Sequence, residues 1–149
     1  MGASTGLDRL AQHAVVGVDS NVFVYLFESS GLLATAAAAA IDGFGDRRVI
    51  FASVGVVEVL GGPARANDRA LMERYLDEIR SLDGIRIIPL DEDIAFASAA
   101  QRGRSGVTLG DAIHLATARA AGATAFITND ARIRSTDDLE VIQLAAFAA

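Results

Sequence analysis

The stretch that decides the fold is Val15-Val16-Gly17-Val18-Asp19-Ser20-Asn21, a short apolar run that ends abruptly in an acidic residue. An apolar run of this length, bounded by turn-forming residues, is typical of a strand buried on both faces of a sheet. The polar residues that follow favour a turn and the N-cap of a helix. Ligands of open parallel sheets bind beyond the carboxyl ends of the strands, so Asp19 is predicted to lie at such an edge.

Apolar runs and helical segments alternate along the rest of the chain. The runs predict strands at residues 49–52, 85–90, 125–128 and 139–142, the last of them at an edge of the sheet. The segments between them predict helices at 22–29, 32–44, 54–60, 67–82, 91–102 and 108–121. Gly61-Gly62-Pro63 is predicted to end the third of these helices, and residues 102–106 to form a loop. Strands alternating with helices indicate an α/β fold, a three-layer sandwich around a mostly parallel five-stranded sheet.

A chain of 149 residues is expected to form one domain with a proper core. We divide it into an extension at residues 1–14, either frayed or a short helix, and a domain at residues 15–149. No apolar segment reaches the roughly 18 residues of a membrane helix. The extension lacks a basic start followed by an apolar run, so we expect no secretory signal and a cytoplasmic protein.

Cys, Lys and Trp are missing from the sequence, and the absence of the first two excludes several chemistries. Without Cys there are no disulfides, thiolate nucleophiles or Cys-based zinc sites. All 13 basic residues are Arg, which excludes Schiff-base lysines and a Walker-type phosphate lysine. The net charge of −6 makes nonspecific nucleic-acid binding unfavourable, because phosphate contacts dominate that affinity. A nucleic-acid role would therefore require a metal ion or a local cluster of arginines.

Four acidic residues are candidates for a common site. Asp19 and Asp130 each follow a predicted strand, and each could instead be a structural cap or turn residue. Asp111 follows Thr108 at the spacing of a capping box, which does not exclude a second role. Glu58 lies in the apolar segment 54–60, where a buried carboxylate is costly unless it is paired or bound to a cation. The alternative is that Glu58 points to solvent from an otherwise buried helix.

Together these acids predict a site for a divalent cation. Carboxylate oxygens are hard ligands that suit Mg²⁺ or Mn²⁺ rather than zinc or copper. Clusters of this kind occur where phosphodiesters are hydrolysed. His114, three residues after Asp111, is either a ligand or base there or a packing residue. The basic residues around the third and fourth acids are either a solvated surface or phosphate contacts, namely Arg102, Arg104, Arg132 and Arg134.

The four acids stand in segments that resemble the motifs of PIN-domain ribonucleases, most closely VapC-type toxins of bacterial toxin–antitoxin pairs. The resemblance extends over residues 15–144. The segments are Val18-Asp19-Ser20-Asn21, Val56-Val57-Glu58-Val59-Leu60, Leu109-Gly110-Asp111-Ala112-Ile113-His114-Leu115-Ala116-Thr117-Ala118 and Ile127-Thr128-Asn129-Asp130. The segment after Asp130 departs from the family, since many relatives have an Asp-Phe pair where this chain reads Ala131-Arg132-Ile133-Arg134.

The resemblance implies a parallel five-stranded sheet, metal-dependent endoribonuclease activity, homodimerisation and neutralisation by a small antitoxin protein. It implies that Asp19, Glu58, Asp111 and Asp130 are catalytic and metal-binding, with Asp19 and Asp111 as direct ligands. Ser20, Thr128 and Asn129 would be supporting polar groups. The leading hypothesis is therefore cleavage of RNA with Mg²⁺ or Mn²⁺. A non-catalytic PIN-like binding module and a metal-dependent phosphatase are the alternatives.

Overall fold

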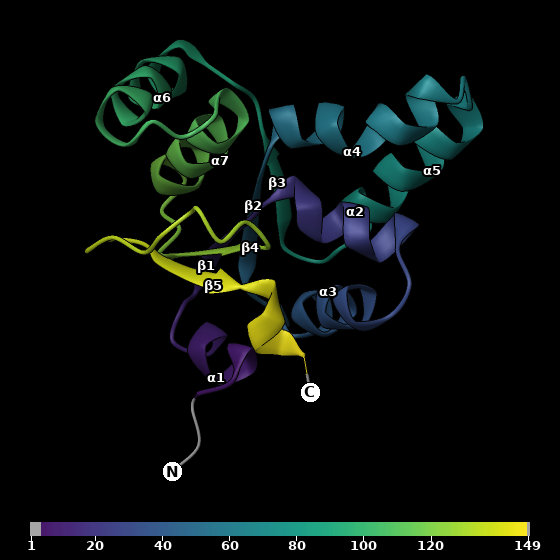
Figure 1. The fold of residues 1–149 in the computed structure, drawn as a ribbon, viewed down its shortest axis with the longest axis horizontal. Helices are drawn as coiled ribbons and strands as arrows, with labels where there is room; N and C mark the ends of the chain where they lie inside the picture. Colours follow the sequence, from purple (N-terminus) through teal and green to yellow (C-terminus); the bar gives the residue numbers. More distant parts are fainter. Residues whose placement is uncertain (1–3, 149) are drawn as a thin grey trace.

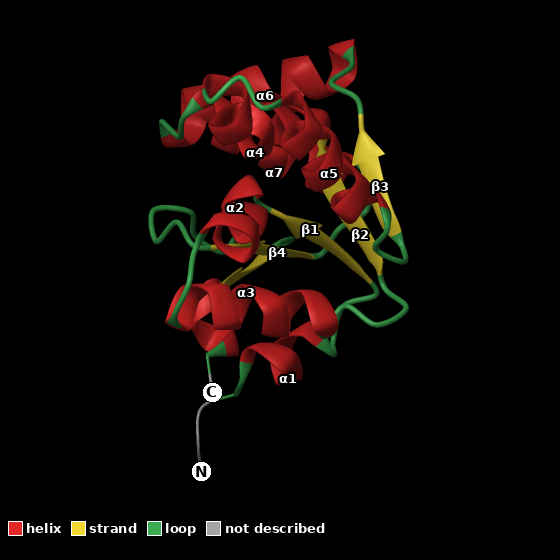
Figure 2. Ribbon diagram, turned by 90° about the vertical axis from the view of Figure 1, so that its right-hand side faces the viewer, coloured by secondary structure: helices red, strands yellow, loops and turns green. Residues whose placement is uncertain are grey.

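The computed structural model describes residues 4–148, and these form a central sheet with helices on both faces (Figures 1 and 2). In chain order the elements are α1 (Gly6–Leu10), β1 (Val15–Val18), α2 (Ser20–Glu28), α3 (Leu32–Asp42), β2 (Arg48–Ala52), α4 (Ser53–Arg65), α5 (Arg69–Arg80), β3 (Ile85–Ile88), α6 (Glu92–Ser105), α7 (Leu109–Ala120), β4 (Ala125–Thr128), β5 (Glu140–Gln143) and the 3₁₀ helix η1 (Leu144–Phe147). The predicted alternation of strands and helices is confirmed.

The sheet has five strands in the order β3-β2-β1-β4-β5, and every neighbouring pair is parallel. This confirms the predicted fold class and the edge position of the last strand. Because β1 lies between β2 and β4, the polar residues after β1 and β4 meet at the same edge. The backbone N–H of Asp19 donates to the carbonyl oxygen of Ile127 at 2.9 Å, which extends the pairing to the start of the site.

Residues of the central strands alternate between two apolar clusters. Val16, Val18 and Phe51 belong to the cluster shared with α2 and α3, whereas Phe126 belongs to the cluster shared with α7. These strand side chains are almost fully buried, which for each contributes roughly 1.5–3 kcal/mol. Gly17 faces α7, where an added Cβ would lie 2.7 Å from the Cβ of Ala118. The glycine therefore allows α7 to pack closely on the strand that ends at Asp19.

The prediction that Gly61-Gly62-Pro63 ends a helix was wrong, because α4 continues to Arg65. Pro63 lies in the last turn, so few helical hydrogen bonds depend on it, and its side chain is buried. An added Cβ at Gly62 would lie 2.5 Å from Oε1 of Glu28. The small residues here permit close packing between α4 and the end of α2 rather than stopping the helix.

Two other boundaries also differ from the prediction. The expected loop at 102–106 is instead the last turn of α6, which ends at Gly106 in the left-handed conformation (φ 67°). Its two arginines stabilise this turn, since cations favour the carboxyl end of a helix. The strand β3 ends at Ile88 rather than residue 90, because Pro89 has no N–H to donate to the ladder.

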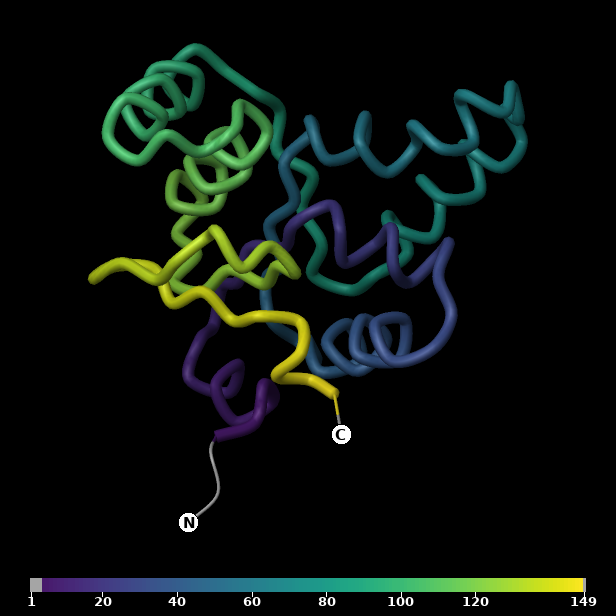
Figure 3. Tube along the Cα trace, viewed as in Figure 1, coloured from purple at the N-terminus to yellow at the C-terminus, as the bar shows by residue number. Residues whose placement is uncertain are grey.

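The start and the end of the described chain pack against each other, as Figure 3 shows for α1 and η1. The side chain of Thr5 accepts a bond from the N–H of Asp8 in a capping box that begins α1. Leu10 is 1% exposed and belongs to the main core. Of the predicted division, residues 1–3 and 149 lie outside the described residues, and the boundary at residue 14 stays a prediction.

Within residues 4–148, no helix combines the length and the apolar composition that a bilayer crossing requires.

Candidate active site at the carboxyl edge of the sheet

Asp19 is buried at the junction of β1 and α2, with only 4% of its surface exposed. As the N-cap of α2, its Oδ1 accepts a hydrogen bond from the N–H of Ser20 at 2.8 Å. Its Oδ2 accepts one from the hydroxyl of Thr128 at 2.7 Å. Burial raises the pKa of Asp19, as do the charges of Asp111 and Glu58, while His114 and the Thr128 hydroxyl oppose this. Asp19 is therefore both the N-cap of α2 and a member of the acidic cluster.

Glu58 lies on α4, and its side chain points toward this acidic cluster. Its Oε1 lies 2.7 Å from Nε2 of His114, and its side chain is 41% exposed. Partial burial is the largest effect on its pKa and raises it, but His114 and the Ser20 hydroxyl lower the pKa below its ordinary value overall. An added Cβ at Gly110 would lie 3.1 Å from Oε2, so this glycine leaves room for the carboxylate beside α7.

His114 is buried between the acids and an aromatic wall. The same Nε2 that contacts Glu58 lies 3.7 Å from Oδ1 of Asp19. The ring faces Phe51 and Phe126, with centroids 6.0 Å and 6.3 Å away. Its Nδ1 is, among the described residues, the buried side-chain nitrogen or oxygen without a hydrogen-bond partner. Because an unpaired buried polar atom is unfavourable for folding, packing alone does not explain a histidine at this position.

Gly55 makes the position of His114 possible, and the sequence analysis did not identify it. A Cβ at Gly55 would lie 2.4 Å from the ring of Phe51 and 2.9 Å from Cε1 of His114. Only a residue without a side chain lets both rings pack against α4. A small residue one turn before an acid in an apolar helix is the sequence pattern that indicates such a close approach.

Asp111 lies in the first turn of α7, half-buried. Its N–H donates to the hydroxyl of Thr108 at 3.2 Å, which is one of the two hydrogen bonds of the predicted capping box. Its charge is close enough to raise the pKa of Asp19 and that of Arg132. Asp111 therefore lies between the buried acids and the segment that follows β4.

The carboxylate of Asp130 forms an ion pair with a neighbouring arginine, Arg132, and is not in direct contact with the other acids. Its Oδ1 accepts from the backbone N–H and Nε of Arg132 at 2.9 Å and 3.0 Å, and its Oδ2 accepts from Nη2 at 2.8 Å. The hydrogen bonds from Arg132 lower the pKa of Asp130. Its N–H also donates to the Thr128 hydroxyl at 3.0 Å, which links it to Asp19 through one side chain.

Asn21 and Asn129 tie the two strand ends together. The N–H of Asn129 donates to Oδ1 of Asn21 at 3.2 Å, and its Nδ2 donates to the hydroxyl of Tyr25 at 3.0 Å. Asn21 Nδ2 lies 3.4 Å from both Oδ2 of Asp19 and the hydroxyl of Thr128. The predicted polar residues after β1 and β4 thus form one connected network.

The donor set fits a hard divalent cation by its chemistry, although it is not a preformed cage. Within residues 4–148, no three His, Asp or Glu side chains already form a group that could hold a metal ion. One oxygen of Glu58 is engaged by His114, and the carboxylate of Asp130 by Arg132. Mg²⁺ keeps several waters and needs only one or two protein carboxylates, which Asp19 and Asp111 would provide. A cation would also offset the repulsion that raises the pKa of Asp19.

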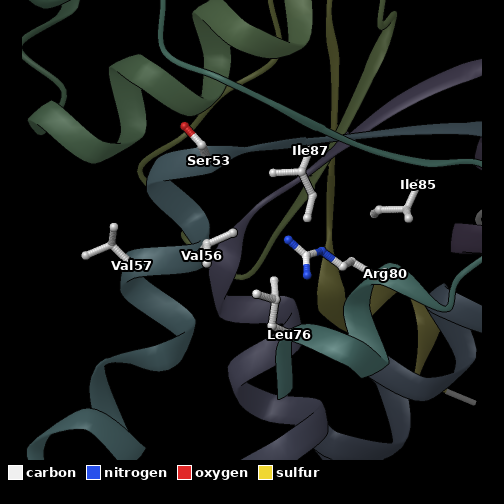
Figure 4. A pocket seen from close by; sticks show the side chains of 7 residues that line it. All are labelled: Ser53, Val56, Val57, Leu76, Arg80, Ile85 and Ile87. Atoms are coloured by element: carbon white, nitrogen blue, oxygen red, sulfur yellow. The ribbon is translucent and has the colours of Figure 1, made fainter. Parts of the chain in front are cut away.

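A separate concavity of about 570 Å³ lies between α4, α5 and β3 (Figure 4). Its lining is mostly apolar and includes one guanidinium group: Ser53, Val56, Val57, Leu76, Arg80, Ile85 and Ile87. None of the four predicted acids lines it. The catalytic candidates and this apolar surface thus occupy different sides of α4.

The predicted basic residues fall into two groups. Arg102 and Arg104 are exposed in the last turn of α6, with Arg102 Nε 3.4 Å from the carbonyl oxygen of Val107. Arg132 and Arg134 follow Asp130 in the segment before β5. Arg119 of α7, which the sequence analysis did not select, lies with this second group around one cavity.

Solved structures with this fold include several toxin–antitoxin proteins. A toxin–antitoxin complex from Klebsiella pneumoniae matches with a TM-score of 0.66 and 22% identity, over 83% of this chain and 94% of that chain. FitAcB from Neisseria gonorrhoeae matches with a TM-score of 0.66 and 23% identity, over 87% and 97%. VapC20 from Mycobacterium tuberculosis is described as a sarcin–ricin loop cleaving toxin. It matches with a TM-score of 0.62 and 13% identity, over 74% of this chain and 86% of that chain.

No curated protein matches the sequence. These three structures are each less than 25% identical to this chain, so they show a shared fold. The family model of the PIN domain matches residues 16–139, which covers the sheet up to the start of its last strand and all four acids. The chain belongs to the PIN domain family.

Proposed function

We propose that this protein is a Mg²⁺- or Mn²⁺-dependent endoribonuclease, the toxin of a VapC-type toxin–antitoxin pair. One observation carries the proposal: Asp19 and Glu58 converge on His114 at the carboxyl edge of the sheet, with the charge of Asp111 beside them. Three like charges in a partly buried space favour a cation. Family membership supports nuclease chemistry, and the likeness to VapC20, a sarcin–ricin loop cleaving toxin, supports RNA as substrate.

We assign a role to each residue from the contacts that it makes. Asp19 and Asp111 would hold the ion, which when bound supplies a Lewis acid and lowers the pKa of water. Thr128 and Ser20 fix the carboxylate of Asp19. Glu58 has Oε1 occupied by His114, which leaves Oε2 to accept a proton from the attacking water. The low pKa of Glu58 keeps this acceptor ionised at neutral pH.

The test is cleavage of total RNA by purified protein with Mn²⁺, with Mn²⁺ plus EDTA, and by the Asp111→Asn variant. We expect cleavage only for the wild type with free Mn²⁺, and an unchanged thermal unfolding midpoint for the variant. Asp77→Asn, which removes an exposed charge on α5, is the matched control and should cleave normally. Cleavage that persists in EDTA would contradict the proposal.

Two further measurements on the same purified protein, Mn²⁺ binding and hydrolysis of an aryl phosphate, separate the alternatives. A protein that binds Mn²⁺ but cleaves no RNA would support a non-catalytic binding module. Hydrolysis of an aryl phosphate in place of RNA would support a phosphatase.

We further propose a small antitoxin as partner, because neighbours with this fold are described as toxin–antitoxin complexes. An antitoxin arginine could neutralise the acids as Arg132 neutralises Asp130. The apolar concavity beside α4 would accept an apolar segment of the same partner. Co-purification with a small neighbouring gene product would test the partner, and its loss in Val57→Asp would test the apolar contact.

A further inference from the structure

A cavity of about 320 Å³ lies between α6, α7 and the segment before β5. Three arginines (Arg119, Arg132 and Arg134) and four uncharged polar residues line it, together with the apolar residues Val107, Leu115 and Ile133. This arginine cavity is unusual in a chain whose net charge is −6. Such a concentration of guanidinium groups suits anions, because each presents several N–H donors in a planar fork.

Arg119 is a fixed part of the cavity wall. Its Nη1 donates to Oε1 of Gln101 at 3.1 Å, and its Nη2 donates to the hydroxyl of Thr136 at 3.0 Å. Its Nε lies 3.3 Å from Oδ2 of Asp138, and only 25% of its side chain is exposed. The guanidinium is thus held in place before any ligand arrives, which reduces the entropy lost on binding.

Arg132 connects the cavity to the acidic cluster. It pairs with Asp130 through Nε and Nη2, and the charge of Asp111 contributes to its raised pKa. One residue therefore lines the cavity and contacts the proposed active site. A chain of phosphates that passes the acids would meet this cavity next.

Arg134 supplies positive charge that is not compensated locally. It is exposed, and no ion pair joins it to an acid among residues 4–148. The other two arginines pair with Asp138 and Asp130, so the cavity keeps an excess of positive charge. An adjoining cavity of about 660 Å³ shares Gln101, Ser105, Arg119 and Thr136, and it adds Arg104 together with Asp138, the acid that pairs with Arg119.

We propose that the arginine cavity binds a backbone phosphate of the RNA, next to the phosphate that is cut at the acidic cluster. The inference rests on the proposed ribonuclease function. It adds a binding site for the part of the RNA strand that leaves the acidic cluster. Backbone phosphates recur at every nucleotide, whereas a peptide would need an acid placed to match. A phosphate subsite also explains how an acidic protein can bind RNA, which is a polyanion. Most of the affinity of proteins for nucleic acids comes from contacts between cations and phosphates.

The test uses a fluorescein-labelled 12-nucleotide single-stranded RNA and the Asp111→Asn background, which is expected not to cut it. In this background, Arg134→Gln should weaken binding roughly five- to tenfold and reduce the slope of log K against log salt by about 1. The matched control is Arg86→Gln, which removes the same charge from the exposed strand β3 at the opposite edge of the sheet. It should change binding by less than twofold.

Each other outcome has a defined meaning. Equal effects of Arg134→Gln and Arg86→Gln, or no RNA binding in the Asp111→Asn background, would overturn the inference. Competition by poly-glutamate as strong as by RNA would also overturn it, because the cavity would then be a site for an acidic peptide. If Arg134-dependent RNA binding is found but the wild type cuts no RNA with Mn²⁺, the proposed function fails while the phosphate subsite stands.

Discussion

Among single residues, His114 has two ring nitrogens in very different surroundings. Its Nε2 lies near the carboxylates of Asp19 and Glu58, whereas its Nδ1 has no hydrogen-bond partner among the described residues. Its Nε2 is the donor that turns Glu58 toward Asp19 instead of toward water. The sequence left open whether His114 acts in the site or packs in the core, and both descriptions apply. It packs against Phe51 and Phe126 and at the same time positions Glu58.

This dual role predicts a difference between two variants of His114. His114→Leu keeps the packing but removes the donor, whereas His114→Gln keeps a donor near the position of Nε2. Because loss of a residue that orients a metal-site group costs about 10–100-fold in activity, we expect that loss for Leu and less than about fivefold for Gln. Initial rates on labelled RNA with saturating Mn²⁺ measure the effect. Activity of His114→Leu at least as high as that of His114→Gln would contradict the positioning role of the Nε2 donor.

At the scale of elements, the N-terminal segment is fastened to the edge strand β5 by charged groups. Glu140 accepts from Arg9 Nε at 2.8 Å and contacts His13 Nε2 at 2.7 Å. His13 Nδ1 lies 2.8 Å from the Thr124 hydroxyl, and the carbonyl oxygen of His13 accepts from Arg47 Nε at 2.8 Å. The sequence analysis found no role for His13. These contacts cover the open side of β5, where an exposed edge would otherwise invite pairing with another chain.

The contact of Glu140 predicts a pH-dependent stability. Burial is the largest effect on its pKa and raises it, but His13 and Arg9 lower it overall, below its ordinary value of 4.5. A lowered pKa in the folded state stabilises the protein above about pH 4.5, and this contribution is lost as the pH falls through the folded-state value. Glu140→Gln should therefore reduce the free energy of unfolding at pH 7 by no more than about 1 kcal/mol, since the pair is partly solvated.

Urea unfolding followed by circular dichroism at pH 7 and at pH 3 measures this difference, which should shrink at the lower pH. Glu73→Gln is the control, because Glu73 forms an exposed pair with Arg69 that contributes little. A difference that grows at low pH would contradict the assignment.

At the scale of the whole molecule, the helices α4, α6 and α7 lie above the sheet in Figure 2, and each has a large apolar side chain that is exposed. Phe96 of α6 is 80% exposed, Val57 of α4 is 71% exposed and Leu109 of α7 is 57% exposed. The hydroxyl of Ser53 accepts from the N–H of Leu90, which joins the start of α4 to the segment before α6. Exposed apolar side chains on neighbouring helices are typical of an interface, and they support the homodimer that the family resemblance implies.

The predicted dimer is tested by light scattering, which should give twice the chain mass of 15.5 kDa. Phe96→Asp should give a monomer, because a charge would then have to be buried at the interface. Leu32→Asp is the matched control, since Leu32 is 67% exposed on α3, on the other side of the sheet in Figure 2. A monomeric wild type would contradict the prediction.

The sequence by itself determined the strands, most of the helices and the acids at their ends, because these depend on interactions between near neighbours in the chain. Apolar runs identify buried strands, and Asp19 and Thr108 cap the helices they precede. Only the tertiary structure decided which carboxylate oxygens are free, that α4 continues past Pro63, and that Arg119 joins the arginine cavity. The contacts responsible join Glu58 to His114 across 56 positions and Thr128 to Asp19 across 109. Local sequence patterns do not predict such pairs, because the packing of the helices on the sheet brings these residues together.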